Sequence, residues 1–397
     1  MNIATLTFHF VQNQGAVLQC IALRRYLEGC GHSVRIIDYR PPYHTCRYGV
    51  RRNPIRYAAW FCGRLTSHPL PRRAAYTARA FARCVYQNLR GDGGFSERFE
   101  DFLRTHLPLT ERYTSLAALR RCPPTADAYI VGSDQVWNAA LLDGRLDPAY
   151  FLQFGDPGVR RIAYAPSTGG VPDAKTLADL GEGCRSLTAV SVREHDAAVL
   201  SAIGREVSVV LDPTLLLDAA DYDTLAAENT QTEPYIFVYG FETNDDICAA
   251  VRLAQKTYSC RVINASPDSI RLDTASEAYR NYTPDTFLAL VKHAACVVTN
   301  SFHGTVFSII YRRPFITVAH TTRGGRMTGL LSSLGLECCL WGSEAFAHPQ
   351  EIAWEDVGVR LEACRAQSRA YLASALGDGE NADEKCVLTD AKTGGKS

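Results

Sequence analysis

The stretch Asn300-Ser301-Phe302-His303-Gly304-Thr305 lies between two apolar runs, residues 294–299 and residues 306–311. The first run is typical of a buried parallel strand, and the second predicts a helix that ends before Pro314. Ser301 is then the N-cap, which places His303 in the first helical turn. Free backbone N–H groups favour an anion there, and an imidazole beside them can hold a phosphate or move a proton. The alternative is a polar turn that only caps a helix.

The composition limits the class of protein. A chain of 397 residues is too long for one ordinary core and predicts two domains. Lys and Arg together number 42, as do Asp and Glu, so the net charge gives no sign of a nucleic-acid partner. Residues 1–15 lack the features of a signal peptide, and no apolar run approaches the ~20 residues of a membrane span. We therefore expect a cytoplasmic protein.

The 14 cysteines are scattered singly, apart from Cys338-Cys339. No CxxC pair and no Cys/His cluster has the spacing of a zinc site, so we predict no structural metal. We expect the cysteines to be reduced thiols in the core or on the surface of a cytoplasmic protein.

Strand-like and helical segments alternate along the first half of the chain. Residues 16–30 have the apolar spacing of a helix. The predicted strands are Asn2–Phe10, Ser33–Asp38, Ala128–Val131, Arg161–Ala165, Thr188–Val192 and Val207–Leu211. Such alternation predicts an α/β fold, a parallel sheet covered by helices on both faces.

The pattern restarts after residue 217, with further predicted strands at Tyr235–Tyr239, Arg261–Asn264, Cys296–Thr299 and Phe315–Val318. We therefore predict two Rossmann-like domains, residues 1–217 and 218–376, whose parallel sheets face a cleft in a GT-B-like arrangement. Residues 377–397 are polar and glycine-rich, and we expect a disordered tail.

A basic, helical insertion is predicted at about residues 41–110. Between Pro41 and Gly91 the sequence has no Asp or Glu. The same window contains Arg47, Arg51, Arg52, Arg56, Arg64, Arg72, Arg73, Arg79, Arg83 and Arg90, interleaved with Tyr57, Trp60, Phe61, Tyr76 and Phe81. Such a segment can dock on anionic lipid headgroups or on an anionic substrate. The alternative is a solvated cover over the first domain.

Ligands of open parallel sheets bind beyond the carboxyl ends of the strands. Four polar loops are expected there, residues 12–15, 132–138, 191–194 and 300–305, and residues 323–326 form a fifth. Their side chains are donors and cations more than carboxylates, which suits an anionic ligand. The candidate binding residues are Asn13, Gln14, Gly15, Ser133, Arg193, Asn300, Ser301, Arg323 and Arg326.

Motifs of competing functions are absent or weak. The sequence has no GxxxxGK[ST] loop, no GxGxxG after a strand and no GxSxG elbow, so we predict no cofactor. Asp221-Tyr222-Asp223 spells DxD, but its setting predicts the start of an ordinary helix.

Six stretches resemble the polysaccharide pyruvyl transferase family, from about Asn13 to Leu336. Gly132-Ser133-Asp134-Gln135-Val136-Trp137-Asn138 and Ser301-Phe302-His303-Gly304-Thr305 are the most specific of them. The others are residues 13–19, residues 162–167, Ser191-Val192-Arg193-Glu194 and Leu211-Asp212-Pro213-Thr214.

The resemblance implies a GT-B-like fold, a phosphoenolpyruvate donor, and transfer of its enolpyruvyl group onto two sugar hydroxyls as a ketal. It also implies that Arg193 and His303 bind the donor. A second Arg, which several members have two residues before that His, is Ser301 here. We expect Arg323 or Arg326 to supply the missing cation. The implied acceptor is a surface polysaccharide or its lipid-linked precursor.

The expected catalytic residues are His303, as general acid, and Asp134, as the base for the acceptor hydroxyl. The alternatives are a turn or helix cap for Asp134, an ion pair with Glu194 for Arg193, and a core position rather than a sugar platform for Trp137. Two other functions stay open at this point: a GT-B glycosyltransferase that uses a nucleotide sugar, and an inactive binding member of the family.

Overall fold

The computed structural model describes residues 1–44, 54–63, 69–90, 92–266, 270–319, 325–346 and 352–378. Within the described helices, the side chains of Arg56, Trp60, Gln87, Arg90 and Arg326 are not described.

The first half of the chain forms a seven-stranded sheet in the order β3-β2-β1-β4-β5-β6-β7, and every pair of neighbours is parallel. Its strands are β1 (Asn2–Leu6), β2 (Ser33–Tyr39), β3 (Leu109–Tyr113), β4 (Ala128–Val131), β5 (Arg160–Ala163), β6 (Ala189–Val192) and β7 (Ser208–Val209). The strand order changes direction between β1 and β4, so the loops after these two strands diverge and leave room for a ligand.

The second half forms a five-stranded parallel sheet in the order β10-β9-β8-β11-β12. Its strands are β8 (Tyr235–Tyr239), β9 (Arg261–Asn264), β10 (Glu277–Ala278), β11 (Cys296–Thr299) and β12 (Phe315–Thr317). The order changes direction between β8 and β11. The predicted α/β fold with two parallel sheets is confirmed, and the division at residue 217 stays our proposal.

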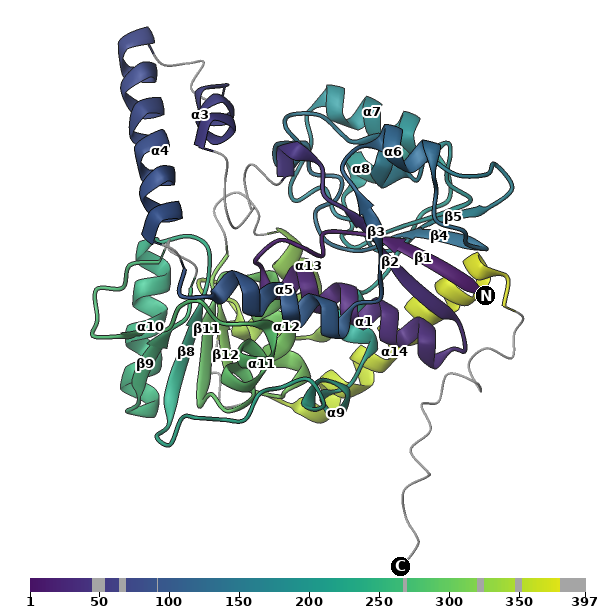
Figure 1. The fold of residues 1–397 in the computed structure, drawn as a ribbon. Helices are drawn as coiled ribbons and strands as arrows, with labels where there is room; N and C mark the ends of the chain where they lie inside the picture. Colours follow the sequence, from purple (N-terminus) through teal and green to yellow (C-terminus); the bar gives the residue numbers. More distant parts are fainter. Residues whose placement is uncertain are drawn as a thin grey trace, which may run out of the picture.

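Most of the helices lie against the two sheets (Figure 1). Those of the first half are α1 (Gln14–Gly29), α3 (Pro54–Gly63), α4 (Leu70–Arg90), α5 (Phe95–His106), α6 (Leu116–Arg121), α7 (Ala174–Cys184) and α8 (Ala197–Ile203). The second half contains α9 (Ala219–Asp223), α10 (Asp245–Tyr258), α11 (Pro284–Lys292), α12 (Phe302–Ile310), α13 (Gly325–Leu334) and α14 (Trp354–Leu376). Short 3-10 turns are η1 (Ala139–Leu141), η2 (Pro148–Phe151), η3 (Pro213–Leu216) and η4 (Glu337–Cys339).

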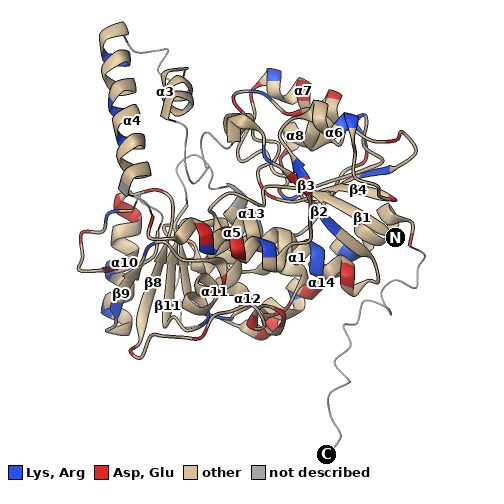
Figure 2. Ribbon diagram, in the orientation of Figure 1, with Lys and Arg blue, Asp and Glu red and all other residues tan. Residues whose placement is uncertain are grey.

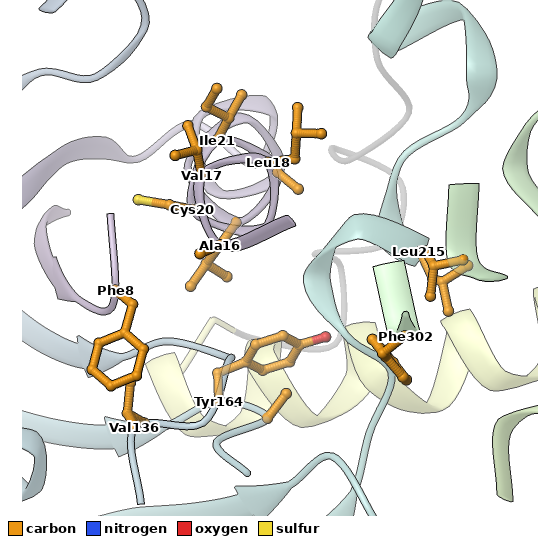
Figure 3. Packing of buried hydrophobic residues seen from close by; sticks show 14 of the residues in the cluster. Phe8, Ala16, Val17, Leu18, Cys20, Ile21, Val136, Tyr164, Leu215 and Phe302 are labelled. Carbon is orange, nitrogen blue, oxygen red and sulfur yellow. The ribbon is translucent and has the colours of Figure 1, made fainter. Parts of the chain in front are cut away.

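The two halves share one hydrophobic core. Side chains of α1, among them Ala16 and Leu18, lie in one cluster with Leu215 and Phe302 (Figure 3). Helix α1 also contacts α11, and the Gln14 side chain donates a hydrogen bond to the carbonyl of Tyr282 at 2.8 Å. This shared core fixes the edges of the two sheets relative to each other.

Helix α14 returns to the first sheet. Arg365 donates to the carbonyls of Leu215 and Leu217, at 2.6 and 2.8 Å. The Tyr371 hydroxyl donates to the carbonyl of Ala163 at 2.8 Å. The last helix therefore braces the end of β5 and the turn that leads into the second half.

Several expected boundaries differ from the structure. The strand predicted at Asn2–Phe10 ends at Leu6, because side chains take over its hydrogen bonding: Gln19 donates to the carbonyl of Phe8 and His9 contacts that of Thr7. Strands β3 and β10 were not predicted. The sequence of β3, Leu109-Thr110-Glu111-Arg112-Tyr113, mixes charges with apolar residues, as an edge strand does, and β10 has only two residues.

The expectation of reduced thiols is wrong at Cys30, which is disulfide-bonded. Eleven other cysteines of the described residues are free, and six of those are buried. No helix in the described part of the chain has the length and apolarity needed to cross a membrane.

Candidate functional site

Loops that follow strands of the two sheets meet at the shared core. From the first sheet come the residues after β1, at the start of α1, and those after β4 and β6. From the second sheet comes the start of α12, after β11. Ser301 caps α12, its Oγ accepting from the Gly304 amide at 3.4 Å, and His303 lies in the first turn as predicted.

Arg193, which follows β6, is buried with 2% of its side chain exposed. Its Nε donates to Glu194 at 2.7 Å and its Nη1 to Asp212 at 2.9 Å. Its Cζ lies 4.3 Å from the centre of the Phe302 ring, a cation–π contact between the two halves of the chain. Nη2 is buried and has no hydrogen-bond partner among the described residues. The guanidinium is therefore fixed on two sides and has one donor group to spare.

Asp212, the residue that caps η3, is the central acceptor of the site. Its Oδ2 accepts from the Ser133 hydroxyl at 2.7 Å as well as from Arg193, and its Oδ1 accepts from the amide and hydroxyl of Thr214. Burial alone would raise the pKa of Asp212, but His303 and Arg193 hold it well below its usual range. Asp212 is thus a charged carboxylate inside the protein.

His303 faces the same carboxylate from the second half of the chain. Its Nε2 lies 3.7 Å from Oδ2 of Asp212, and within the described residues it has no hydrogen-bond partner. The ring packs on Gly15: a Cβ added at residue 15 would lie 2.7 Å from the Cβ of His303 and closer still to the ring. Glycine is required here for this close approach.

Asn13 caps α1, its Oδ1 accepting from the Ala16 amide at 3.2 Å. The starts of α1 and α12 therefore meet where Gly15 touches His303, and both helix N-termini contribute positive potential to this place. Asp134 has a left-handed backbone, with φ of 75°, and its side chain accepts from the amide of Gln135. Burial would lower the pKa of Arg193, but Glu194, Asp212 and Asp134 together raise it, so Asp134 lies near enough to act on the guanidinium.

Other predicted binding residues have structural partners. The Asn300 amide accepts from the Phe241 amide and donates to the carbonyl of Glu242, both at 2.8 Å, so it fixes the loop after β8. Gln14 binds the carbonyl of Tyr282, as described above. Arg323 lies outside the described residues, and of Arg326 only the backbone, in α13, is described. The expected replacement of the second Arg therefore stays a proposal.

The sequence analysis did not identify Asp212 or Phe302 as site residues. Asp212 was noted only as part of a family-like stretch, Leu211-Asp212-Pro213-Thr214. A lone acid between Leu211 and Pro213, directly after a predicted buried strand, was the signal that could have marked it.

A cavity of about 450 Å³ adjoins Arg193. Its lining comes from both halves of the chain and includes Asp212, Phe302, Leu330 and Gln367, but not His303. Trp137 also borders it, yet this side chain is fully buried, donates to the carbonyl of Tyr150 and stacks on Phe151. Trp137 therefore packs in the core rather than serving as a platform for a sugar. No group of three or more His, Cys, Asp or Glu in the described ranges could hold a metal ion.

A family model described as polysaccharide pyruvyl transferase matches residues 13–322. No curated protein matches the chain.

Solved structures resemble the whole chain only distantly. The UDP-N-acetylglucosamine 2-epimerase from Rickettsia bellii is 10% identical with a TM-score of 0.45, over 96% of this chain and 98% of that one. The UDP-GlcNAc 2-epimerase from Methanocaldococcus jannaschii, in complex with UDP-GlcNAc and UDP, is 13% identical with a TM-score of 0.42, over 91% and 93%. The Streptomyces sp. SF2575 glycosyltransferase SsfS6, complexed with thymidine diphosphate, is 13% identical with a TM-score of 0.40, over 93% and 96%.

Proposed function

This chain belongs to the polysaccharide pyruvyl transferase family, and from that premise we propose that it transfers the enolpyruvyl group of phosphoenolpyruvate onto two hydroxyls of one sugar. The products are a pyruvyl ketal and phosphate. The acceptor is a surface polysaccharide or its lipid-linked precursor, and the reaction takes place in the cytoplasm without a further cofactor.

The observation that supports this proposal most strongly is the pair of spare buried nitrogens beside Asp212. Arg193 Nη2 and His303 Nε2 have no hydrogen-bond partner among the described residues. Both side chains face the same carboxylate oxygen, from which Arg193 Nη1 lies 2.9 Å away and His303 Nε2 3.7 Å away. Buried polar groups ordinarily have partners, so an unpaired guanidinium nitrogen at this place supports binding of an anionic group. Phosphoenolpyruvate has a carboxylate and a phosphate that suit such donors.

The proposed reaction moves two protons. One acceptor hydroxyl adds to C2 of the donor while the methylene carbon C3 gains a proton and becomes a methyl group. The C2–O bond to phosphate then breaks, and the second hydroxyl closes the ketal. One hydroxyl proton ends on the methyl group and the other on the released hydrogen phosphate. In this scheme His303 supplies the proton to C3, and Arg193 binds the donor anion.

We assign different roles to the two acids of the site. Asp212 is a positioning residue: it accepts from Ser133 and Arg193 and faces His303, so it orients the groups that touch the donor. Asp134 is the proposed base for an acceptor hydroxyl, since its charge lies near Arg193 at the end of β4.

The cavity beside Arg193 is the proposed acceptor site. About 450 Å³ lies within the range of small-molecule pockets. Its walls combine apolar side chains such as Val192 and Leu330 with polar ones such as Thr168 and Gln367. A sugar ring needs this mixture, because it has apolar C–H faces and a rim of hydroxyls.

Calorimetry with phosphoenolpyruvate and with UDP-sugars tests the proposal. We expect phosphoenolpyruvate to bind, inorganic phosphate to compete with it, and UDP-sugars to have no effect. Phosphate release on adding a panel of glycans or lipid-linked sugars then tests turnover. Binding of UDP-sugars without binding of phosphoenolpyruvate would replace the proposal with a glycosyltransferase. If phosphoenolpyruvate binds but no acceptor causes release of its phosphate, the protein is an inactive binding member of the family.

A further inference from the structure

Helices α3 and α4 form an arm outside the two sheets (Figure 1). The face of α4 that packs on α3 consists of Arg73, Thr77, Ala80 and Cys84, spaced as successive turns of one helix face. Ala80 and Cys84 are buried, and Nε of Arg73 donates to the carbonyl of Cys62 at 3.0 Å. This contact defines the inner side of α4.

A second stripe of α4 is apolar, and all of its members except the half-buried Val85 are exposed. Its members recur every three or four residues: Leu70, Ala74, Ala78, Phe81, Val85 and Leu89. Leu70 and Leu89 are 79% and 82% exposed, and Phe81 is 40% exposed. Apolar residues at this spacing normally face a core, and here no core covers them within the described residues.

A third stripe contains arginines and tyrosines. It runs through Arg72, Tyr76, Arg79, Arg83 and Tyr86, all exposed, with the same helical spacing. Figure 2 shows α4 with basic positions and no acidic ones. The apolar stripe and the Arg/Tyr stripe lie on opposite flanks of α4, and together they make up its outer side, the surface that does not pack on α3.

We propose that this outer side of α4 is a docking surface for an anionic lipid bilayer. An amphipathic helix that lies in the membrane interface buries its apolar stripe among the acyl chains, and its arginines bind the lipid phosphates. Tyrosine suits the headgroup level, because its ring is apolar and its hydroxyl is polar. The helix of 21 residues provides an extended contact rather than a pocket.

The charge pattern favours a lipid surface over a second copy of this chain. Two copies that pair through their apolar stripes would bring together two helices that each have several arginines and no acid. Neither copy could neutralise them locally, because the sequence has no Asp or Glu between Pro41 and Gly91. This proposal does not depend on the reaction proposed above.

Co-sedimentation of the full chain with vesicles tests the proposal. We expect binding to vesicles of equal parts phosphatidylglycerol and phosphatidylcholine, no binding to phosphatidylcholine alone, and loss of binding at high salt. Arg72→Gln/Arg79→Gln/Arg83→Gln should weaken binding roughly 100-fold, since each basic residue near an anionic membrane contributes about fivefold. Phe81→Ser/Leu89→Ser should weaken it about tenfold or more.

The matched control is Arg104→Gln/Arg185→Gln/Arg252→Gln, which removes the same charge from exposed positions of the body. It should bind vesicles like the unchanged protein, and every variant should bind phosphoenolpyruvate equally. The proposal is overturned if the unchanged protein ignores anionic vesicles at low salt, or if the arm variants bind them as well as the control does. A dimer in sedimentation velocity that Phe81→Ser/Leu89→Ser converts to monomer would assign the stripe to a second copy instead.

Discussion

The imidazole of His303 rests on the backbone of Gly15, 288 residues earlier in the chain. A Cβ at residue 15 would lie 2.7 Å from the Cβ of His303, so the start of α1 and the start of α12 touch where no side chain intervenes. The contact joins the two halves at the candidate site. The position of His303 therefore depends on α12 of the second half and on α1 of the first.

Gly15→Ala should therefore displace His303 without unfolding the protein. Inserting a methyl group into a packed interior typically costs about 1–3 kcal/mol, and at this position the ring must move. We expect phosphate release to fall at least tenfold, with a smaller effect on the unfolding free energy measured in urea. Gly358→Ala in α14 is the control, because its nearest neighbour would lie at 3.8 Å. Equal activity of both variants would show that the contact does not position His303.

Asp212→Asn should destabilise the fold and weaken donor binding together. The change removes the charge that offsets buried Arg193, and loss of one partner of a buried ion pair costs about 3–5 kcal/mol. Urea denaturation measures the stability and calorimetry the affinity for phosphoenolpyruvate. Asp218→Asn is the matched control: Asp218 also pairs with an arginine, Arg365, but its side chain is 73% exposed, so the loss should stay below about 1 kcal/mol.

The same carboxylate predicts the pH dependence of stability. The pKa of Asp212 is depressed in the folded state, so its ionisation stabilises the fold above the unfolded value of about 3.9. That contribution is lost as the pH falls below this value and approaches the folded pKa. Unfolding free energies measured from neutral pH to about pH 3 should therefore fall less steeply for Asp212→Asn than for the unchanged protein. Parallel curves would mean that Asp212 does not contribute to acid sensitivity.

Most of the two sheets could be predicted because their strands are buried on both faces. Strands β4, β8, β9 and β11 have the predicted bounds, since each has a buried apolar centre. The edge strand β3 has a charged sequence, and its pairing with β2 depends on tertiary contacts that local periodicity does not show.

The candidate site was predictable only as a set of loops. Parallel strands bring their carboxyl ends to one edge, so Ser133, Arg193 and His303 were expected near one another. The sequence could not show that Asp212 links all three, because its partners lie 19 to 91 positions away in the chain. Nor could it show that Asn300 and Gln14 use their amides on backbone groups.

Arg193→Ala should weaken binding of phosphoenolpyruvate by roughly 1.5–3 kcal/mol, the usual contribution of a hydrogen bond to a charged group. Arg193→Lys should recover only part of this affinity. The lysine ammonium lacks the planar fork of donors with which arginine can bind Glu194, Asp212 and a ligand at the same time. Calorimetry gives both values. Arg185→Ala, which breaks an exposed pair with Glu182, is the control and should bind normally. Unchanged affinity in both Arg193 variants would make this residue purely structural.

The reaction should need neither a divalent metal nor a nucleotide. The anionic donor is matched here by arginine, imidazole and helix N-termini, which act without a metal bridge. We expect phosphate release from phosphoenolpyruvate to be the same with and without EDTA. Activity that disappears with EDTA and returns with magnesium or manganese would contradict the proposed reaction and support a nucleotide-sugar glycosyltransferase.

His303→Ala should abolish turnover and leave the fold intact. Protonation of C3 by a positioned acid typically contributes about 10²–10⁴-fold, and the described residues offer no second imidazole beside Asp212. The variant should keep the circular dichroism spectrum of the unchanged protein, because Nε2 of His303 has no hydrogen-bond partner within the described residues. It should still bind phosphoenolpyruvate, though more weakly, since Arg193 remains. His293→Ala, at the exposed end of α11, controls for loss of an imidazole and should keep full activity. If His303→Ala releases phosphate at the rate of that control, His303 is not the acid, and the contact with Gly15 serves only to pack the two halves together.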